Sequence, residues 1–244
     1  MKRKFVILTH ARTGSTWLVD TLNNIEGVTS HGELFLNRAT MDDFGNSKMP
    51  RFLLWKKDKS GTRPFLTYRY LNGIFNNKAI SGFKLMYLHL ARYPEISTFM
   101  AFRRVAVIHL LRKNLLESVL SSLVAKERGK FHYRKPEIIP EEKPIKVDPQ
   151  FLVKRIKSTE MKNNMTRSLL KRTLVRHIEV YYEDLLAGTE SFRPIWDFLG
   201  VDFEKHPPTW QLKKARSKTP KQTILNYEEA HAALSKAGYD HFLY

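Results

Sequence analysis

The stretch FVILTHARTGSTWLVD, residues 5–20, joins an apolar run, a short polar turn and the beginning of a helix. Its run FVILT is typical of a buried strand. After the turn, apolar residues recur at helical spacing, at Trp17, Leu18, Leu22 and Ile25. A strand that passes through a tight turn into a helix is the repeating unit of α/β proteins, so this stretch predicts that class of fold.

The turn HARTGST has the features of an anion-binding loop. It contains the small and hydroxyl-bearing residues Thr13, Gly14, Ser15 and Thr16. Their successive backbone amides would lie at a helix N-terminus, where the helix dipole favours negative charge, and Arg12 can fork onto two oxygens of an anion. The nucleotide-triphosphatase loop Gly-x-x-x-x-Gly-Lys-Ser/Thr has a lysine where this chain has Ser15, which disfavours a kinase or triphosphatase.

Further strands and helices follow from the same two periodicities. Apolar runs predict strands at residues 4–10, 79–88, 105–111 and 176–182, and helical spacing predicts helices at 15–26 and 114–128. Strands separated by helices indicate a P-loop-like three-layer α/β/α fold with a mostly parallel central sheet. The proline-containing stretch 129–149 is expected to be a surface excursion, either a linker or a lid over the site.

The composition indicates one globular domain that covers residues 1–244. A chain of 244 residues with 42% hydrophobic content is long enough for one sizeable core. The absence of cysteine excludes disulfides, zinc–thiolate sites and cysteine nucleophiles. No apolar run reaches the length of a signal-peptide core or of a transmembrane helix, which predicts a soluble, cytoplasmic protein.

The charge balance is strongly basic. The chain has 42 Lys and Arg against 24 Asp and Glu, a formal net charge of +18. Such an excess favours polyanionic partners, among them nucleic acid, acidic glycan, anionic lipid and a multiply phosphorylated cofactor. The basic residues are densest at 48–63, 126–135, 171–176 and 213–221, so they are spread along the chain instead of forming one arm.

A second motif, VIHLLRKNLLESVLSS at residues 107–122, places Arg112 directly after a predicted buried strand. Ligands of open parallel sheets bind at the carboxyl ends of the strands, so Arg112 is expected to face the same crevice as the first loop. The predicted helix behind it carries Ser118 and Ser121. Two anion sites in one crevice predict a nucleotide that is phosphorylated at both ends.

The segments RTGSTWL and RKNLLESVLS resemble the donor-binding motifs of sulfotransferases that use 3′-phosphoadenosine-5′-phosphosulfate. HIEVYYEDLLAG, IWDFLGV and KTPKQTILNYEE are also similar to that family, so the likeness extends from about residue 5 to 230. The resemblance implies that residues 12–16 hold the 5′-phosphosulfate, and that Arg112 and a serine about two helical turns further on hold the 3′-phosphate. Ser121, nine residues after Arg112, fits the family spacing of eight or nine; Ser118, at six, is the alternative.

The resemblance implies three further donor contacts and no metal. Tyr182 would lie near the adenine or the 3′-phosphate, and core packing is the alternative for this aromatic side chain. Lys218 and Lys221 resemble a basic C-terminal segment that closes over the 3′-phosphate, and solvated surface lysines are the alternative. Trp17 and Trp55 are expected to serve in packing, and stacking on a sugar ring is the alternative for Trp55.

The segments SHGELF and GFKLMYLH contain the candidates for the reacting groups. The sequence is more similar to the bacterial carbohydrate sulfotransferases, of the trehalose and nodulation-factor types, than to the cytosolic branch. The GE of SHGELF is a feature of the bacterial and tyrosylprotein branches, in which the glutamate is the base. This implies Glu33 as the base, and Lys84, together with Arg12, beside the transferred sulfonate. His89 is the rival base, because the cytosolic branch has a histidine shortly after the lysine. A continuous strand would point Lys84 and His89 to opposite faces unless it ended or bulged between them, which favours Glu33.

These residues predict an enzyme that moves a sulfuryl group from the donor nucleotide to an acceptor hydroxyl, on a carbohydrate or a glycolipid. The implied partners are that donor and that acceptor, with no specific nucleic acid. Two alternatives stay open. A P-loop nucleotide kinase would need magnesium and a loop lysine, and a polyanion or nucleic-acid-binding module would account for the net charge although the chain has no recognised reading motif.

Overall fold

The protein is described by a computed structural model, which covers residues 3–35, 63–76, 78–133, 135–173, 175–212, 216 and 218–244. The chain divides into two compact units. The first unit consists of Met1–Leu111 and Leu170–Trp210, and the second unit consists of Arg112–Leu169 and Gln211–Tyr244. Trp55 and all of the basic stretch 48–63 except Arg63 lie outside the described residues. Folding of the two units as a single domain stays a prediction.

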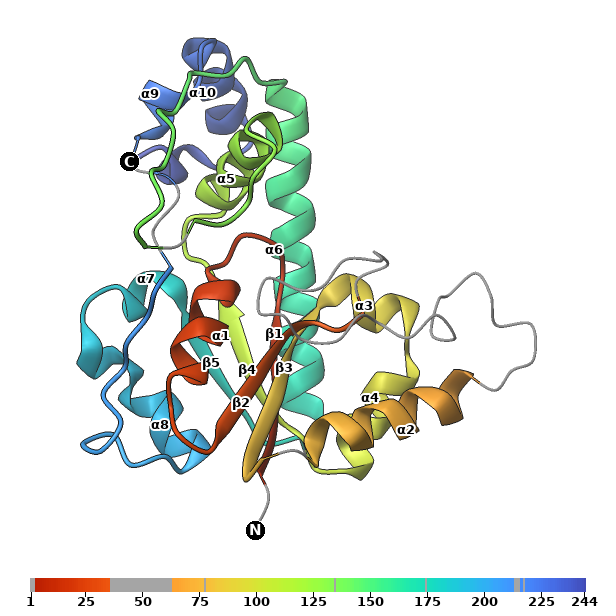
Figure 1. Cartoon of the computed structure of the whole chain (residues 1–244). Coiled ribbons are helices and arrows are strands. Elements are labelled where there is room, and N and C mark those ends of the chain that lie inside the picture. Colours follow the sequence, from red (N-terminus) through yellow and green to blue (C-terminus); the bar gives the residue numbers. More distant parts are fainter. Residues whose placement is uncertain are drawn as a thin grey trace. The chain divides into compact units, whose positions relative to one another are not determined.

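The first unit is built on a parallel sheet of five strands in the order β2-β3-β1-β4-β5 (Figure 1). The strands are β1 (Arg3–Thr9), β2 (Val28–Glu33), β3 (Ile80–Met86), β4 (Ala106–Leu111) and β5 (His177–Tyr181). Four of them confirm the predicted strands at 4–10, 79–88, 105–111 and 176–182. The sequence does not predict β2, because VTSHGE contains no apolar run.

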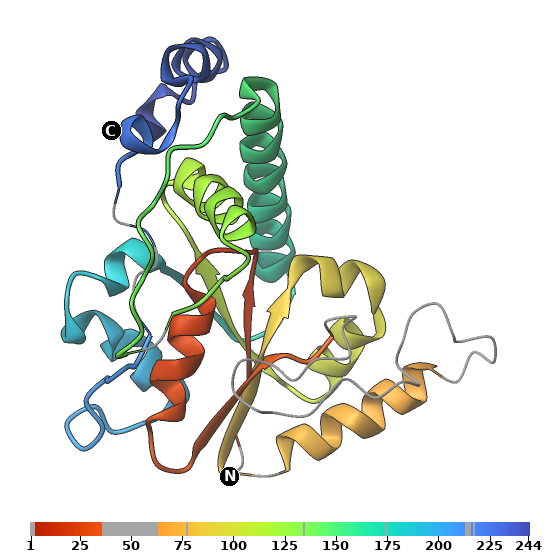
Figure 2. The ribbon, with the colours of Figure 1, turned by 45° about the horizontal axis from the view of Figure 1, so that its top comes forward.

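Helices cover both faces of this sheet, as predicted for the three-layer fold (Figure 2). One face packs on α1 (Ser15–Asn23), α7 (Tyr182–Leu185) and α8 (Arg193–Leu199), with the short helix η3 (Thr189–Phe192) between the last two. The other face packs on α2 (Arg63–Phe75), α3 (Tyr87–Arg92) and α4 (Glu95–Phe102). Strand β1 shows the alternation that this requires, with Phe5 and Ile7 in the first core and Val6 and Leu8 in the second.

The second unit is helical. It contains α5 (Leu115–Glu127), which confirms the predicted helix at 114–128, most of α6 (Pro149–Arg172), α9 (Pro220–Thr223), α10 (Tyr227–Lys236) and the short helix η4 (Asp240–Phe242). Its core includes Leu116, Leu120, Leu152, Ile156 and Leu234. The described residues between α5 and α6 form no helix or strand, apart from an isolated bridge between Ile145 and Ile224.

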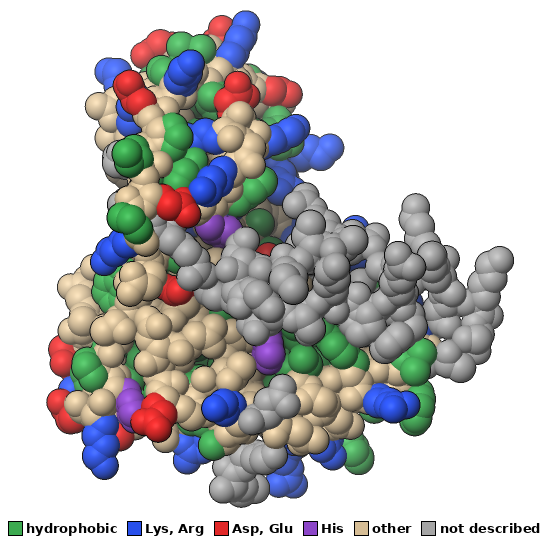
Figure 3. Space-filling model, in the orientation of Figure 1, with side chains coloured by type: hydrophobic (Ala, Val, Ile, Leu, Met, Phe, Trp, Pro, Cys, Tyr) green, Lys and Arg blue, Asp and Glu red, His purple; other side chains and the backbone are tan. Residues whose placement is uncertain are grey.

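Two further features of the structure concern its surface charge and the apolar character of its helices. On the face shown in Figure 3, Lys and Arg side chains are scattered over both units, in keeping with the spread of basic residues along the sequence. Within the described part of the chain, no helix combines the length and the apolar character needed to cross a membrane.

Candidate active site

The predicted anion-binding loop connects β1 to α1. Gly14 is the N-cap residue of α1, with φ of 77°, and no side chain caps this helix end. Arg12 also has a positive φ, 64°, which a residue with a Cβ adopts at a cost in free energy. Backbone strain of this kind is concentrated at ligand-binding loops, so the conformation agrees with the predicted role.

Three threonine contacts hold the loop on the sheet. The hydroxyl groups of Thr9 and Thr13 lie 2.5 Å apart. Thr13 donates to the carbonyl of His10 at 3.1 Å, and Thr9 donates to the carbonyl of Leu110 in β4 at 2.8 Å. The loop is therefore tied to both β1 and β4 by buried hydrogen bonds, which fixes the direction of its backbone amides.

Tyr182 lies against the tip of this loop. A Cβ added to Gly14 would come within 2.2 Å of the Tyr182 ring, so only glycine permits this approach. The predicted strand at 176–182 ends one residue early, and Tyr182 is the first residue of α7. Trp17 contacts the ring of Tyr182 edge-on, together with Phe192 and Trp210, which confirms its packing role.

Glu33, Lys84 and Thr16 meet beside the loop. Lys84 Nζ lies 2.8 Å from Glu33 Oε1 and donates to Thr16 Oγ1 at 3.3 Å. The lysine side chain is 9% exposed and the glutamate side chain 24%. A largely buried ammonium group is thus held at the N-terminus of α1, next to a carboxylate that solvent or a ligand can reach.

His89 belongs to the same cluster, although a continuous strand would point His89 and Lys84 to opposite faces of the sheet. Strand β3 ends at Met86 instead of residue 88, and His89 lies on α3. Its Nε2 is 4.0 Å from Glu33 Oε2, and its Nδ1 accepts a hydrogen bond from the backbone N–H of Met86 at 3.3 Å. Burial lowers the pKa of His89 to about 4, against an opposing effect of Glu33 that raises it.

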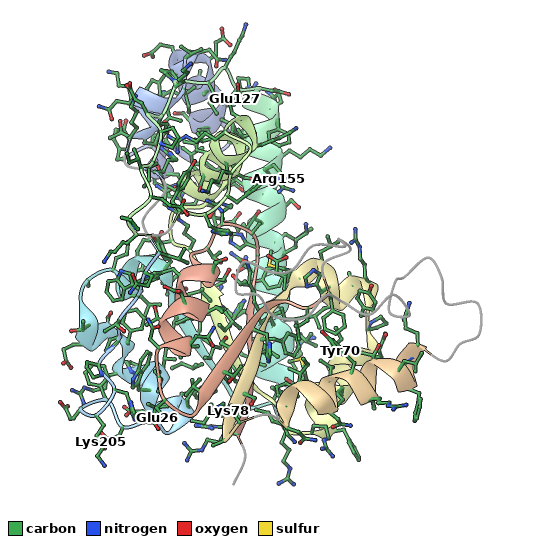
Figure 4. All side chains as sticks on the ribbon, viewed as in Figure 1. Glu26, Tyr70, Lys78, Glu127, Arg155 and Lys205 are labelled. Atoms are coloured by element: carbon green, nitrogen blue, oxygen red, sulfur yellow. The ribbon has the colours of Figure 1, made fainter. Side chains whose placement is uncertain are left out.

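This cluster lies at the carboxyl ends of the strands, where open parallel sheets bind ligands. Glu33 is the last residue of β2, and Lys84 lies two residues before the end of β3. The labels of Figure 4 mark Glu26 and Lys78, the exposed residues that precede the amino ends of the same two strands. Charged residues thus occur at both ends of these strands, but only the carboxyl ends adjoin the loop.

The residues predicted to hold the 3′-phosphate belong to the second unit. Arg112 follows β4 directly, and its Nη2 lies 3.5 Å from Glu117 Oε2 in the first turn of α5. On the same helix, Ser118 is buried and Ser121 is half-buried. The predicted crevice shared by Arg112 and the first loop stays a prediction, because the structure describes the two units separately.

The C-terminal lysines have partners inside the second unit. Lys218 donates to the carbonyl of Glu142 at 2.5 Å and lies 3.5 Å from the carboxylate of Glu141. Lys221 is exposed, with its ammonium group 6.0 Å from the centre of the Tyr227 ring. The predicted contact of both lysines with the 3′-phosphate stays a prediction.

A buried polar cluster that no sequence motif predicts joins this segment to α5. Arg216 donates to Glu142 Oε1 at 3.0 Å, to Glu117 Oε2 at 2.8 Å and to Thr223 Oγ1 at 3.0 Å. Glu117 therefore lies between Arg216 and Arg112. These residues are far apart in the sequence, and no short motif connects them.

Among the residues that the structure describes, no three His, Asp or Glu side chains gather so that they could hold a metal ion.

The fold is that of the sulfotransferases. The chain is similar to the sulfotransferase domain from the curacin biosynthetic pathway, with 16% identity, a TM-score of 0.50, and coverage of 84% of this chain and 76% of that one. It is also similar to a sulfotransferase from Alicyclobacillus acidocaldarius, with 15% identity, a TM-score of 0.50, and coverage of 99% and 96%. A mouse sulfotransferase, SULT7A1 complexed with PAP, matches with 12% identity, a TM-score of 0.46, and coverage of 83% and 60%. No model of a protein family and no curated protein matches the sequence.

Proposed function

We propose that the protein transfers a sulfuryl group from 3′-phosphoadenosine-5′-phosphosulfate to a hydroxyl group of a carbohydrate or glycolipid. The observation that carries the proposal is the meeting of Glu33, Lys84 and Thr16 beside the loop, within a fold shared with sulfotransferases. The resemblance of the sequence as a whole to the bacterial carbohydrate enzymes supports the class of acceptor.

The reaction requires the protein to position the donor and the acceptor and to stabilise the charge that develops between them. A bond forms between the acceptor oxygen and sulfur as the bond between sulfur and the phosphate oxygen breaks, and adenosine 3′,5′-bisphosphate leaves. Arg12, Lys84 and the loop amides neutralise the charge on the sulfonate and on the leaving phosphate. An ammonium group has three donor hydrogens, so Lys84 can keep its contact with Glu33 and still donate to the sulfonate.

Glu33 is the base in this proposal and accepts the proton of the acceptor hydroxyl. The hydrogen bonding of His89 supports this choice. Because its Nδ1 accepts the Met86 N–H, the neutral ring carries its proton on Nε2, the atom that faces Glu33. A nitrogen that already bears a proton cannot accept another without becoming charged, and burial opposes that charge.

The remaining donor contacts are assigned as the sequence predicts. Arg112 and Ser121, with Lys218 and Lys221, would hold the 3′-phosphate, and Tyr182 would lie near the adenine or the 3′-phosphate. The packing of the Tyr182 ring on Gly14 supports a donor contact close to the loop. Arginine suits the 3′-phosphate because its fork donates two hydrogen bonds to one phosphate.

Two measurements test the proposal. The first incubates the protein with the donor and a panel of oligosaccharides, glycolipids and phenols, and uses mass spectrometry to detect an added sulfonate on the carbohydrates. The second records Tm, which adenosine 3′,5′-bisphosphate is expected to raise whereas ATP with magnesium is not. A Tm that rises with ATP and magnesium, and not with adenosine 3′,5′-bisphosphate, would indicate a kinase. Duplex DNA binding with a steep salt dependence, and no response to the bisphosphate, would indicate a polyanion-binding module.

A further inference from the structure

A chain of three polar side chains crosses the sheet face that packs on α2, α3 and α4. The Tyr87 hydroxyl lies 2.6 Å from His109 Nε2, and His109 Nδ1 lies 3.3 Å from Glu179 Oε2. His109 is completely buried. It lies on β4 on the same face of the sheet as the apolar Val107, and its register partner on β5 is Glu179.

The protonation of this chain follows from its outer members. In the tautomer that fits an ionised Glu179, which can only accept, His109 carries its proton on Nδ1, on the side of that carboxylate. Its Nε2 is then an acceptor, and the Tyr87 hydroxyl donates to it. Glu179 is itself fixed by the Tyr181 hydroxyl, which donates to Oε1 at 3.0 Å.

Tyr87 is the first residue of α3, the helix that also carries His89. Since β1 lies between β3 and β4, the hydrogen bond from Tyr87 to His109 spans the central strand of the sheet. The Tyr87 ring also lies 6.3 Å, centre to centre, from the ring of His10, which opens the anion-binding loop. The start of α3 is therefore anchored to β4, across the central strand β1. His89 on the same helix lies against Glu33.

We propose that the Glu179–His109–Tyr87 chain is a positioning device, which fixes the start of α3 so that His89 stays in place beside Glu33. Tyr87 and His109 are positioning residues and need not touch either substrate. The link to catalysis rests on the function proposed above, whereas the link between the chain and His89 does not. A polar chain in an apolar layer fits such a role, because an apolar pair could fill the same space without fixing a direction.

The test is the double variant Tyr87→Phe/His109→Leu, which replaces the hydrogen-bonded pair by an apolar pair of similar size. Removing both partners of a buried hydrogen bond has little effect on stability, so the variant is expected to fold with a Tm close to that of the wild type. Its kcat is expected to fall about tenfold, well short of the loss expected for Glu33→Gln, through misplacement of the reacting groups, with the donor KM within about twofold. NMR titration is expected to move the pKa of His89 upward, toward that of an exposed histidine.

Tyr68→Phe is the matched control. It removes another tyrosine hydroxyl that packs on the same core, one that lies 2.7 Å from Thr98 Oγ1 and links α2 to α4. This variant is expected to keep the wild-type kcat and the wild-type pKa of His89. An unchanged kcat and an unchanged pKa of His89 in the folded double variant would overturn the proposal. If the wild type transfers no sulfonate, the proposed function fails, and the NMR titration still decides whether the chain positions His89.

Discussion

Glu33 and Lys84 are register partners in the neighbouring parallel strands β2 and β3, and their charged groups lie 2.8 Å apart. The pairing depends on a shift of register in β2 between His31 and Glu33, at Gly32. With a regular register Gly32 would oppose Lys84, and Glu33 would point to the opposite face. The irregularity at Gly32 therefore brings the carboxylate to the lysine.

Glu33→Gln tests the proposed base. The amide keeps the shape of the side chain but cannot accept the proton, so the transfer rate is expected to fall by roughly 100-fold or more. Binding of adenosine 3′,5′-bisphosphate, measured by calorimetry, is expected to stay near that of the wild type. His89→Gln is expected to have a much smaller effect on the transfer rate, and the reverse ranking with the same acceptor would make His89 the base.

The pH dependence of stability tests the environment of His89. Its pKa of about 4 in the folded protein lies below the ordinary value of 6.5, so between these pH values the unfolded chain binds a proton that the folded one does not. The free energy of unfolding is therefore expected to fall as the pH drops from 6.5 to 4, by about 3 kcal/mol from this residue.

Urea titrations at pH 7 and pH 4.5, on the wild type and on His89→Gln, measure this contribution. The variant is expected to lose less stability between the two pH values than the wild type does. Equal losses would show that His89 titrates as an exposed histidine. The lower pKa has burial as its main cause, assisted by Lys84 and Arg92 and opposed by Glu33.

Arg112→Ala tests the predicted contact with the 3′-phosphate. The loss of a charge-assisted hydrogen bond is expected to weaken binding of adenosine 3′,5′-bisphosphate by roughly 1.5 to 3 kcal/mol, while binding of adenosine 5′-phosphate changes little. The control is Arg155→Ala, which removes the same charge from an exposed position on α6, labelled in Figure 4. If both nucleotides lose affinity equally, Arg112 does not read the 3′-phosphate.

Local patterns in the sequence predict much of the fold. The runs FVILT and VAVIHLL predict β1 and β4, since strands buried on both faces are continuously apolar. Strand β2 is missed because Ser30, His31 and Gly32 interrupt any such pattern. Helix α6 is missed because its lysines, asparagines and threonines leave no clear apolar stripe.

The candidate site is predictable only where it follows from one segment. The loop residues and the pair of Glu33 and Lys84 come from short motifs, and the structure brings Thr16 of the loop to that pair. The position of His89 depends on where β3 ends, and strand ends are set by tertiary packing more than by local sequence. A glycine within a strand often marks a bulge, so Gly32 in SHGELF is a local signal for the irregularity of β2.

Gly14→Ala tests the close approach of Tyr182 to the loop. The new Cβ would lie 2.2 Å from a ring carbon, at a φ of 77° that disfavours alanine. Strain of this kind is expected to lower the free energy of unfolding by roughly 1 to 3 kcal/mol and to weaken bisphosphate binding. Gly73→Ala is the control, because a Cβ there meets nothing within 4 Å and alanine favours a helix, so stability is expected to rise slightly. Equal effects of the two substitutions would contradict the packing of Tyr182 on Gly14.

Arg216→Ala tests the buried cluster that joins the C-terminal segment to α5. The side chain of Arg216 is 5% exposed and that of Glu142 is 4% exposed, so the substitution leaves a buried carboxylate without its cation. The free energy of unfolding is expected to fall by roughly 3 to 5 kcal/mol. Arg193→Ala is the control. It removes an arginine that pairs with Glu190 and Glu204 at the surface, and little change is expected.

The double variant Arg216→Ala/Glu142→Gln separates the buried charge from the lost packing. A neutral amide avoids the cost of an unpaired carboxylate, so part of the stability is expected to return, measured by urea denaturation. Absence of any recovery would mean that packing of the arginine side chain dominates. Glu117 is shared between Arg216 and Arg112, at 2.8 and 3.5 Å. If this sharing orients Arg112, Arg216→Ala is expected also to weaken binding of adenosine 3′,5′-bisphosphate under conditions in which the variant remains folded.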